Sequence, residues 1–240
     1  MSRLTCNAFF NGCLKINQDQ SGYRFSIDAV IAAAAVQPKA GDLVLDLGTG
    51  CGIIPLILAF RYPDIRICGI EIQADLAGLS RMNVAANHQQ DRIVILQADI
   101  RDLTPHMVGG VADWIVSNPP YRKARSGRVN PNAQRALARH EINISLKELI
   151  ESAMRLLRTG GRFLTIYAAE RAAELIHEMR LNGIEPKWLQ SIHSQAETNA
   201  KMVLVQGKKG GRPGLQIAAP LVIYDPEGDY TQAVQAMMTA

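Results

Sequence analysis

The sequence predicts an α/β protein with a Rossmann-like, doubly wound, mostly parallel seven-stranded sheet and an antiparallel C-terminal end. Between residues 43 and 182, short and almost continuously apolar segments alternate with helix-like segments, which is typical of a parallel sheet covered on both faces. A glycine cluster follows the first of these apolar segments, as expected where a strand turns into a helix. The last quarter has two successive strand-like segments joined by a short polar link, which indicates an antiparallel pair.

The individual elements follow from local signals in chain order. Ser26 can cap a helix that reaches Val36 and stops before Pro38. Strand 43–47 ends at the glycine cluster, and helix 53–60 follows it, with its proline in the first turn, where it is tolerated. The other elements expected up to residue 182 are strands 65–70, 92–97, 111–117 and 162–167 and helices 74–88, 145–157 and 168–182. The last quarter is expected to form strands 187–194, 201–206 and 215–224 and helix 230–238.

Length and composition favour one globular, cytoplasmic domain. The 240 residues suffice for a core, and 48% hydrophobic with 20% charged residues excludes a disordered chain. No apolar run is long enough for a membrane span, no export signal is evident, and the four cysteines form no Cys-x-x-Cys pair, so we expect neither zinc nor disulfides. Within this domain we expect a polar N-terminal extension and helix at 1–40, the core at 41–210 and an appended strand and helix at 211–240.

Three acidic residues stand where three successive predicted strands end. Asp46 leads the glycine cluster, Glu71 comes 25 positions later, and Asp99 another 28 positions later. The glycines allow a tight turn and let a ligand approach the backbone at a helix N-terminus. A carboxylate about twenty residues further on suits the two hydroxyls of a ribose. Because parallel strands share a carboxyl edge, we expect one nucleotide site there.

The glycine turn differs from the dinucleotide fingerprint Gly-x-Gly-x-x-Gly, because an acid leads it. That acid would repel a phosphate but suits a cationic amino-acid group. At these residues the chain resembles class I S-adenosylmethionine-dependent methyltransferases, over about residues 25–210. The resemblance implies S-adenosylmethionine as the cofactor, with its methionine part at the glycine loop, its ribose at the acid ending the second strand and its adenine near the acid after the third. The cofactor residues so implied are Asp46, Gly48, Thr49, Gly50, Gly52, Glu71, Ile72, Ala98, Asp99, Ile100 and Asn118.

The segment Asn118-Pro119-Pro120-Tyr121 follows the fourth predicted strand and resembles the signature of amino-methyltransferases. An exocyclic amine is a poor nucleophile because its lone pair is shared with the ring. The Asn118 side-chain oxygen and the Pro119 main-chain carbonyl can accept hydrogen bonds from the amine, which points the lone pair at the sulfonium methyl. The prolines keep both acceptors rigid, and Tyr121 can stack on a target base. These four are the expected catalytic residues, and neither a general base nor a metal is required.

The positive charge is concentrated directly after this segment. Residues 114–140 contain six basic residues and no acidic one, so the rest of the chain carries −2 (the net +4 minus 6). Like charges gathered in one loop favour a polyanionic partner. We therefore expect nucleic-acid phosphates to bind at Arg122, Lys123, Arg125, Arg128, Arg135 and Arg139.

Residues 23–29 and 220–225 resemble segments of one subfamily, bacterial enzymes that methylate N6 of the adenine beside the anticodon of a valine tRNA. This resemblance implies a tRNA substrate and an N-terminal element that helps to close the cofactor pocket, with Phe25 and Asp28 near the cofactor. A simple first-turn acid is an equally good account of Asp28. The alternatives are glutamine methylation of release factors, guanine-N2 methylation of ribosomal RNA and a non-catalytic RNA-binding module. The first of these has a helical domain ahead of its glycine loop, whereas only 45 residues precede Asp46 here.

Overall fold

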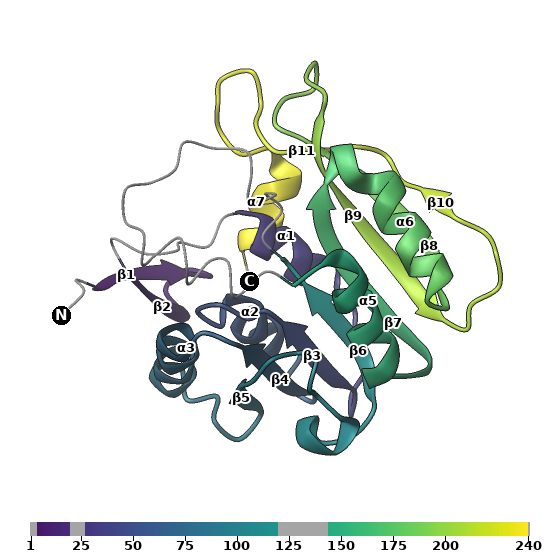
Figure 1. The fold of residues 1–240 in the computed structure, drawn as a ribbon. Coiled ribbons are helices and arrows are strands. Elements are labelled where there is room, and N and C mark those ends of the chain that lie inside the picture. Colours follow the sequence, from purple (N-terminus) through teal and green to yellow (C-terminus); the bar gives the residue numbers. More distant parts are fainter. Residues whose placement is uncertain (1–3, 20–26, 120–143, 240) are drawn as a thin grey trace, which may run out of the picture.

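The predicted α/β fold is confirmed by a computed structural model, which describes residues 4–19, 27–119 and 144–239 (Figure 1). In these residues one mixed sheet has nine strands, and not the expected seven, because two short strands near the C-terminal end also pair with β8. The strand order is β10-β8-β9-β7-β6-β3-β4-β5, and β11 also pairs with β8. The seven longer strands are β3 (Leu43–Leu47), β4 (Arg66–Glu71), β5 (Ile93–Gln97), β6 (Ala112–Ser117), β7 (Leu157–Ala168), β8 (Ile184–His193) and β9 (Ala200–Lys209).

The five strands β5, β4, β3, β6 and β7 are parallel to one another. The chain forms β3, β4 and β5 outward in one direction and then returns to place β6 and β7 on the other side of β3. The strand order therefore reverses between β3 and β6. In open α/β sheets, ligands bind at the carboxyl ends of the strands beside such a reversal.

Helices cover both faces of the sheet, as its near-continuous apolar strands require (Figure 1). On one face, α1 (Ile27–Ala35), α2 (Ile53–Arg61) and α3 (Ala74–Ala86) form one buried cluster with strand residues such as Val44. On the other face, α5 (Leu146–Leu156) and α6 (Ala172–Leu181) pack against neighbours such as Leu45. Successive strand residues point to opposite faces, so Val44 and Leu45 belong to different clusters.

The C-terminal end contains the expected antiparallel strands, because β9 pairs antiparallel with both β7 and β8. The prediction of a single strand over 215–224 is wrong. Two short strands, β10 (Gln216–Ile217) and β11 (Leu221–Val222), pair with β8 instead. Pro220 lies between them and has no N–H to donate, which interrupts the pairing. The chain then forms α7 (Gln232–Met238), where the Met237 carbonyl accepts a hydrogen bond from Arg61 of α2 at 2.6 Å.

Residues 4–19 form an antiparallel hairpin, β1 (Leu4–Phe9) and β2 (Leu14–Asp19), where the sequence indicated only a polar extension. Its apolar side chains Phe10, Leu14 and Ile16 are buried in the cluster that contains α2 and α3. The Phe10 ring lies 4.9 Å from that of Phe60. The hairpin is therefore packed on the body of the protein and covers this side of α2 and α3.

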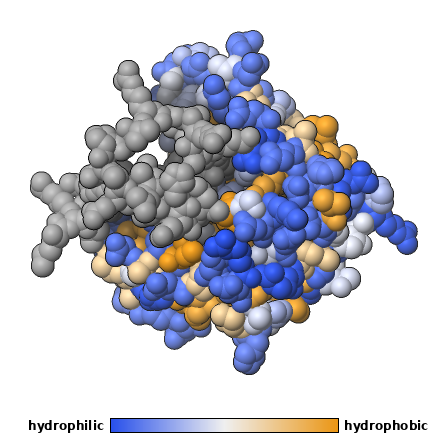
Figure 2. Space-filling view, in the orientation of Figure 1, coloured by the Kyte–Doolittle hydropathy of each residue, from blue (hydrophilic) through white to orange (hydrophobic). Residues whose placement is uncertain are grey.

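The face seen in Figure 1 is mainly hydrophilic, with smaller apolar areas between the polar side chains (Figure 2). Within residues 4–19, 27–119 and 144–239, no helix has the length and apolar character that crossing a bilayer requires.

Candidate functional site

The strand register brings the predicted motifs to one edge of the sheet. Leu47 pairs with Ile70 on one side and with Ser117 on the other. The next residue on each of these three strands, namely Gly48, Glu71 and Asn118, therefore stands at the same level. Glu71 pairs in turn with Gln97, so Ala98 and Asp99 follow directly beside it. All of them lie at the carboxyl ends of β3, β4, β5 and β6 (Figure 1).

The glycine loop folds back on the end of β4. The Gly48 and Thr49 N–H groups both donate to the Ile70 carbonyl at 2.9 Å. Gly48 has φ +82°, and a Cβ there would meet no described atom within 4 Å, so the backbone is open to a ligand on that side. Gly52 also has a positive φ, +85°, but there is no free space beside it. A Cβ added at Gly52 would stand 2.4 Å from Ser80 Oγ on α3. The first glycine thus leaves room for a ligand, and the second leaves room for a helix.

Glu71 is buried and connects the loop to the strand end. Its Oε2 accepts from the Gly50 N–H at 3.0 Å, and its Oε1 accepts from the Gln73 N–H at 3.0 Å. A carboxylate has about four acceptor positions, so each oxygen keeps one for a hydroxyl. The interpretation of Glu71 as a ribose ligand fits this geometry. Its second role, holding the glycine loop, was not predicted.

Asp46 is a fully buried carboxyl, and neither of its oxygens has a hydrogen-bond partner in the described part of the chain. Burial raises the pKa of Asp46 to about 7, while the nearby Thr49 hydroxyl opposes this rise and the Glu71 charge adds to it. The Thr49 hydroxyl makes no hydrogen bond of ordinary geometry among these residues. A buried carboxylate needs a partner to offset its lost hydration. The site therefore suits a ligand with a cationic or hydrogen-bond-donating group.

Asp99 has a partner that the sequence interpretation missed. Its Oδ1 accepts from the Arg101 N–H at 2.9 Å, and its Oδ2 accepts from Arg101 Nη2 at 2.5 Å. Hydrogen bonds from Arg101 hold the pKa of Asp99 below its usual value. Arg101 also reaches Glu148 Oε1 of α5 at 3.3 Å. The Asp-x-Arg spacing was the available signal, because an aspartate that ends a strand often bonds the backbone two residues on.

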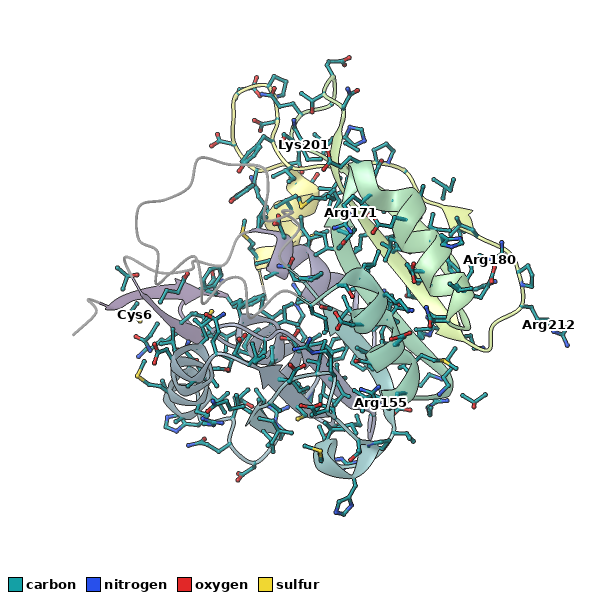
Figure 3. All side chains as sticks on the ribbon, viewed as in Figure 1. Cys6, Arg155, Arg171, Arg180, Lys201 and Arg212 are labelled. Carbon is teal, nitrogen blue, oxygen red and sulfur yellow. The ribbon has the colours of Figure 1, made fainter. Side chains whose placement is uncertain are left out.

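A second unpredicted arginine, Arg155, supports the same segment from α5 (Figure 3). Its Nε donates to the Leu103 carbonyl at 2.9 Å, and its Nη2 donates to the Ile100 carbonyl at 3.1 Å. Ile72, Ala98 and Ile100 are half-buried along this edge, where a planar ring could pack against them.

The end of β6 is fixed to the end of β3 just before the predicted reactive segment. The Ser117 hydroxyl donates to the Leu47 carbonyl at 2.8 Å in a buried position. Asn118 is half-buried and Pro119 is buried, and the register of β3 and β6 sets Asn118 beside the start of the glycine loop. Asp28 is half-buried in the first turn of α1.

Several predicted residues lie outside the described residues. They are Phe25, Pro120, Tyr121, Arg122, Lys123, Arg125, Arg128, Arg135 and Arg139. Over the described ranges, no group of three or more His, Cys, Asp or Glu side chains could hold a metal ion.

The chain is similar to known proteins in sequence and in fold. The family model of the methyltransferase small domain matches residues 29–185, more than half of the chain. A tRNA1(Val) (adenine(37)-N6)-methyltransferase of Porphyromonas gingivalis is 40% identical over 166 residues, which cover 67% of this chain but only 64% of that relative, a little under two thirds of its length. A protein of the same name from Haemophilus influenzae is 30% identical over 97% of this chain and 95% of its own.

Among solved structures, a predicted O-methyltransferase of Agrobacterium tumefaciens superposes with a TM-score of 0.69. The match covers 88% of this chain and 94% of that chain at 21% sequence identity. At this identity the likeness concerns the fold alone.

Proposed function

Because the chain belongs to the methyltransferase small domain family, we propose that it transfers the methyl group of S-adenosylmethionine to N6 of an adenine in tRNA, adenine 37 of a valine tRNA. The observation that carries this proposal is the register of β3, β4 and β6, which sets Asn118 beside the glycine loop and Glu71. The relatives at 30% and 40% identity, named for this reaction, supply the choice of nucleotide.

The residues present fit the cofactor of this family, S-adenosylmethionine, which supplies a methyl group on a positively charged sulfur. Asp46 offers an unpaired buried carboxyl to its cationic amino-acid part, and Gly48 leaves the backbone open beside it. Glu71 keeps acceptor positions for the ribose hydroxyls. Asp99 is held ionised by Arg101 and can accept from the adenine amine.

For the acceptor, Asn118 and Pro119 provide two hydrogen-bond acceptors at the edge of the sheet. When the N6 amine donates to both, its lone pair turns away from the ring and toward the methyl group. The nitrogen gains the methyl as the bond between carbon and sulfur breaks, and the amine gives up one proton to water. Since the Ser117–Leu47 hydrogen bond fixes the strand end, little reorganisation is needed.

The remaining parts of the proposal concern the partner. We assign tRNA docking to the basic segment from Arg122 to Arg139, and base stacking to Tyr121, on the strength of their residue types and sequence position. We propose a cytoplasmic site of action, because a tRNA substrate is available there. We also propose one methyltransferase domain, in which residues 1–40 help to close the cofactor pocket.

The substitution Asn118→Ala tests the mechanism. We expect methyl transfer to fall by about a hundredfold or more, the usual loss of one preorganised hydrogen-bonding group at a reacting centre. Cofactor affinity, measured by calorimetry, should stay within threefold of the unmodified protein. Near-normal turnover of the variant would contradict the proposed role.

The substrate is tested by incubating the protein with labelled S-adenosylmethionine and total RNA or total protein from a deletion strain. We expect N6-methyladenosine in one valine tRNA, identified by mass spectrometry of the nucleosides. Methylglutamine in a release factor or N2-methylguanosine in ribosomal RNA would replace the proposed substrate.

A further inference from the structure

Asn83 on α3 is a completely buried carboxamide whose hydrogen-bonding capacity is fully used. Its Oδ1 accepts from the N–H and the Nδ2 of Asn17 on β2, at 2.8 and 3.0 Å. Its Nδ2 donates to the Asn17 carbonyl at 3.0 Å and to the Cys51 carbonyl of the glycine loop at 2.9 Å. An asparagine amide has two donor hydrogens and two acceptor lone pairs, so all four positions are occupied.

Asn87, the residue directly after α3, makes a similar contact with β2, and its Nδ2 also donates to the Asn83 carbonyl at 2.8 Å. None of its hydrogen bonds in the described part of the chain reaches the glycine loop. The Lys15 N–H donates to Asn87 Oδ1 at 2.9 Å, and Asn87 Nδ2 donates to the Lys15 carbonyl at 2.7 Å. From Lys15 to Asn17 a strand advances about 6.8 Å, and from Asn83 to Asn87 a helix advances about 6.0 Å. The spacing of the two side-chain amides therefore matches the spacing of the two β2 residues that they contact. The helix thus substitutes for a neighbouring strand along this edge of the hairpin.

This pairing also sets the direction of the chain. From Lys15 to Asn17, β2 runs from the end of α3 toward its beginning, and α3 begins just after Glu71 at the carboxyl edge of the sheet. The C-terminal end of β2 therefore points toward the end of α3 that adjoins the carboxyl edge of the sheet.

The glycine loop is held from two sides by these contacts. Glu71 accepts from the Gly50 N–H, and Asn83 donates to the carbonyl of the next residue, Cys51. Ser80, one turn before Asn83 on the same face of α3, packs against Gly52. A shift of Asn83 would therefore move the loop and the hairpin together.

We infer that Asn83 is a positioning residue for the cofactor, which fixes the glycine loop and the N-terminal hairpin in one register and so couples hairpin docking to cofactor binding. The inference rests on the proposed use of the glycine loop as the S-adenosylmethionine site. Coupling of this kind is reciprocal: a docked hairpin strengthens cofactor binding, and bound cofactor strengthens hairpin docking by the same factor.

The test compares Asn83→Ala with Asn87→Ala in the full-length protein. Both lose hydrogen bonds to β2, but only Asn83 reaches the glycine loop. Calorimetry with S-adenosylmethionine, at a temperature where both variants are folded, should show at least tenfold weaker binding for Asn83→Ala and less than threefold for Asn87→Ala. Binding by Asn83→Ala within threefold of the unmodified protein, or equal losses in both variants, would overturn the inference.

A second measurement needs no variant and decides the matter if Asn83→Ala does not fold. Saturating S-adenosylmethionine should slow hydrogen exchange of the Asn17 amide in the unmodified protein by tenfold or more. An unchanged exchange rate would overturn the inference. Failure of the unmodified protein to bind S-adenosylmethionine would overturn it together with the proposed function, whereas binding without methyl transfer to RNA would overturn the proposed function alone.

Discussion

At the scale of single residues, the burial of the Asp46 carboxyl lowers the stability of the folded chain. Its pKa is about 7 in the folded chain and 3.8 in an ordinary aspartate, and burial is the main cause. Between pH 3.8 and about 7, the Asp46 carboxyl is ionised in the unfolded chain but still mostly protonated in the folded one. The free energy of unfolding therefore falls as the pH rises from about 4 to 7, and this loss persists at higher pH.

The substitution Asp46→Asn removes this ionisation while preserving the shape of the side chain. We expect its melting temperature without cofactor to exceed that of the unmodified protein by about 4 °C or more at pH 8, and by less at pH 5. Thermal unfolding at both pH values measures this difference. An advantage that does not grow with pH would contradict the assigned pKa.

Cofactor binding should respond to pH in the opposite sense. In the proposed site, ionised Asp46 attracts the cationic part of S-adenosylmethionine, so we expect the affinity of the unmodified protein to increase between pH 6 and pH 8. In Asp46→Asn the affinity should fall at least about tenfold at pH 8 and lose most of this increase. Calorimetric titrations of both proteins across this pH range make the comparison. Parallel pH profiles would show that the rise belongs to another group.

The acids at the strand ends could be predicted from sequence, because an apolar segment followed by a carboxylate is a local signal. The contacts of Arg155 could not. Its side chain reaches the segment after β5 from α5, and the packing of α5 is set by contacts far apart in sequence. The raised pKa of Asp46 likewise depends on how completely the surrounding elements exclude water.

At the scale of elements, the glycine loop and α3 fit each other through one close approach. A Cβ at Gly52 would stand 2.4 Å from Ser80 Oγ but 3.4 Å from Ser80 Cβ. The hydroxyl is therefore the obstacle. The positive φ at Gly52 adds backbone strain to any substitution.

These two contributions can be separated. Gly52→Ala should lower the free energy of unfolding by roughly 2–4 kcal/mol, from backbone strain together with overpacking. In a Ser80→Ala background, the same change should cost only about 1 kcal/mol, because the strain remains and the clash is gone. Denaturant unfolding of the four proteins gives the double-mutant cycle. Equal losses in both backgrounds would mean that the helix moves away instead.

The long strands followed from sequence because they are almost continuously apolar, and the helices because helix-like segments alternate with them. The hairpin of β1 and β2 could not be predicted from sequence, because apolar and polar residues alternate in β2 over only six positions. The outward edge of β2 also pairs with the side chains of Asn83 and Asn87, and no local pattern predicts such contacts. The interruption at Pro220 was visible in the sequence, although a single strand over 215–224 was expected across it.

At the scale of the whole molecule, positive charge occurs at both ends of the antiparallel strands, and only one end adjoins the candidate site. Lys201, at the start of β9, lies near Arg171, which follows the carboxyl end of β7, whereas Arg180 and Arg212 lie at the opposite end (Figure 3). The exposed Arg212 is therefore a matched control for the basic segment after Tyr121.

Reversing the charges of Arg122, Lys123 and Arg125 to glutamate should weaken tRNA binding by tenfold or more and reduce its dependence on salt, because fewer counterions are released. Arg212→Glu should leave the tRNA affinity and its salt dependence within about twofold of the unmodified protein, because dissolved salt screens a charge that does not contact the tRNA. Binding measured at several salt concentrations makes the comparison. Equal effects per reversed charge would mean that tRNA is attracted by overall charge and not by this segment.

The unpaired carboxyl of Asp46 has a consequence for the lifetime of the protein in a cell. A ligand that binds only the folded chain stabilises it by mass action, and here the ligand offsets a penalty that is largest at neutral pH. When S-adenosylmethionine is scarce, more molecules unfold and become accessible to proteases. The amount of this protein should therefore follow the methyl-donor supply, so that nutrient state would regulate it through degradation without any dedicated sensor.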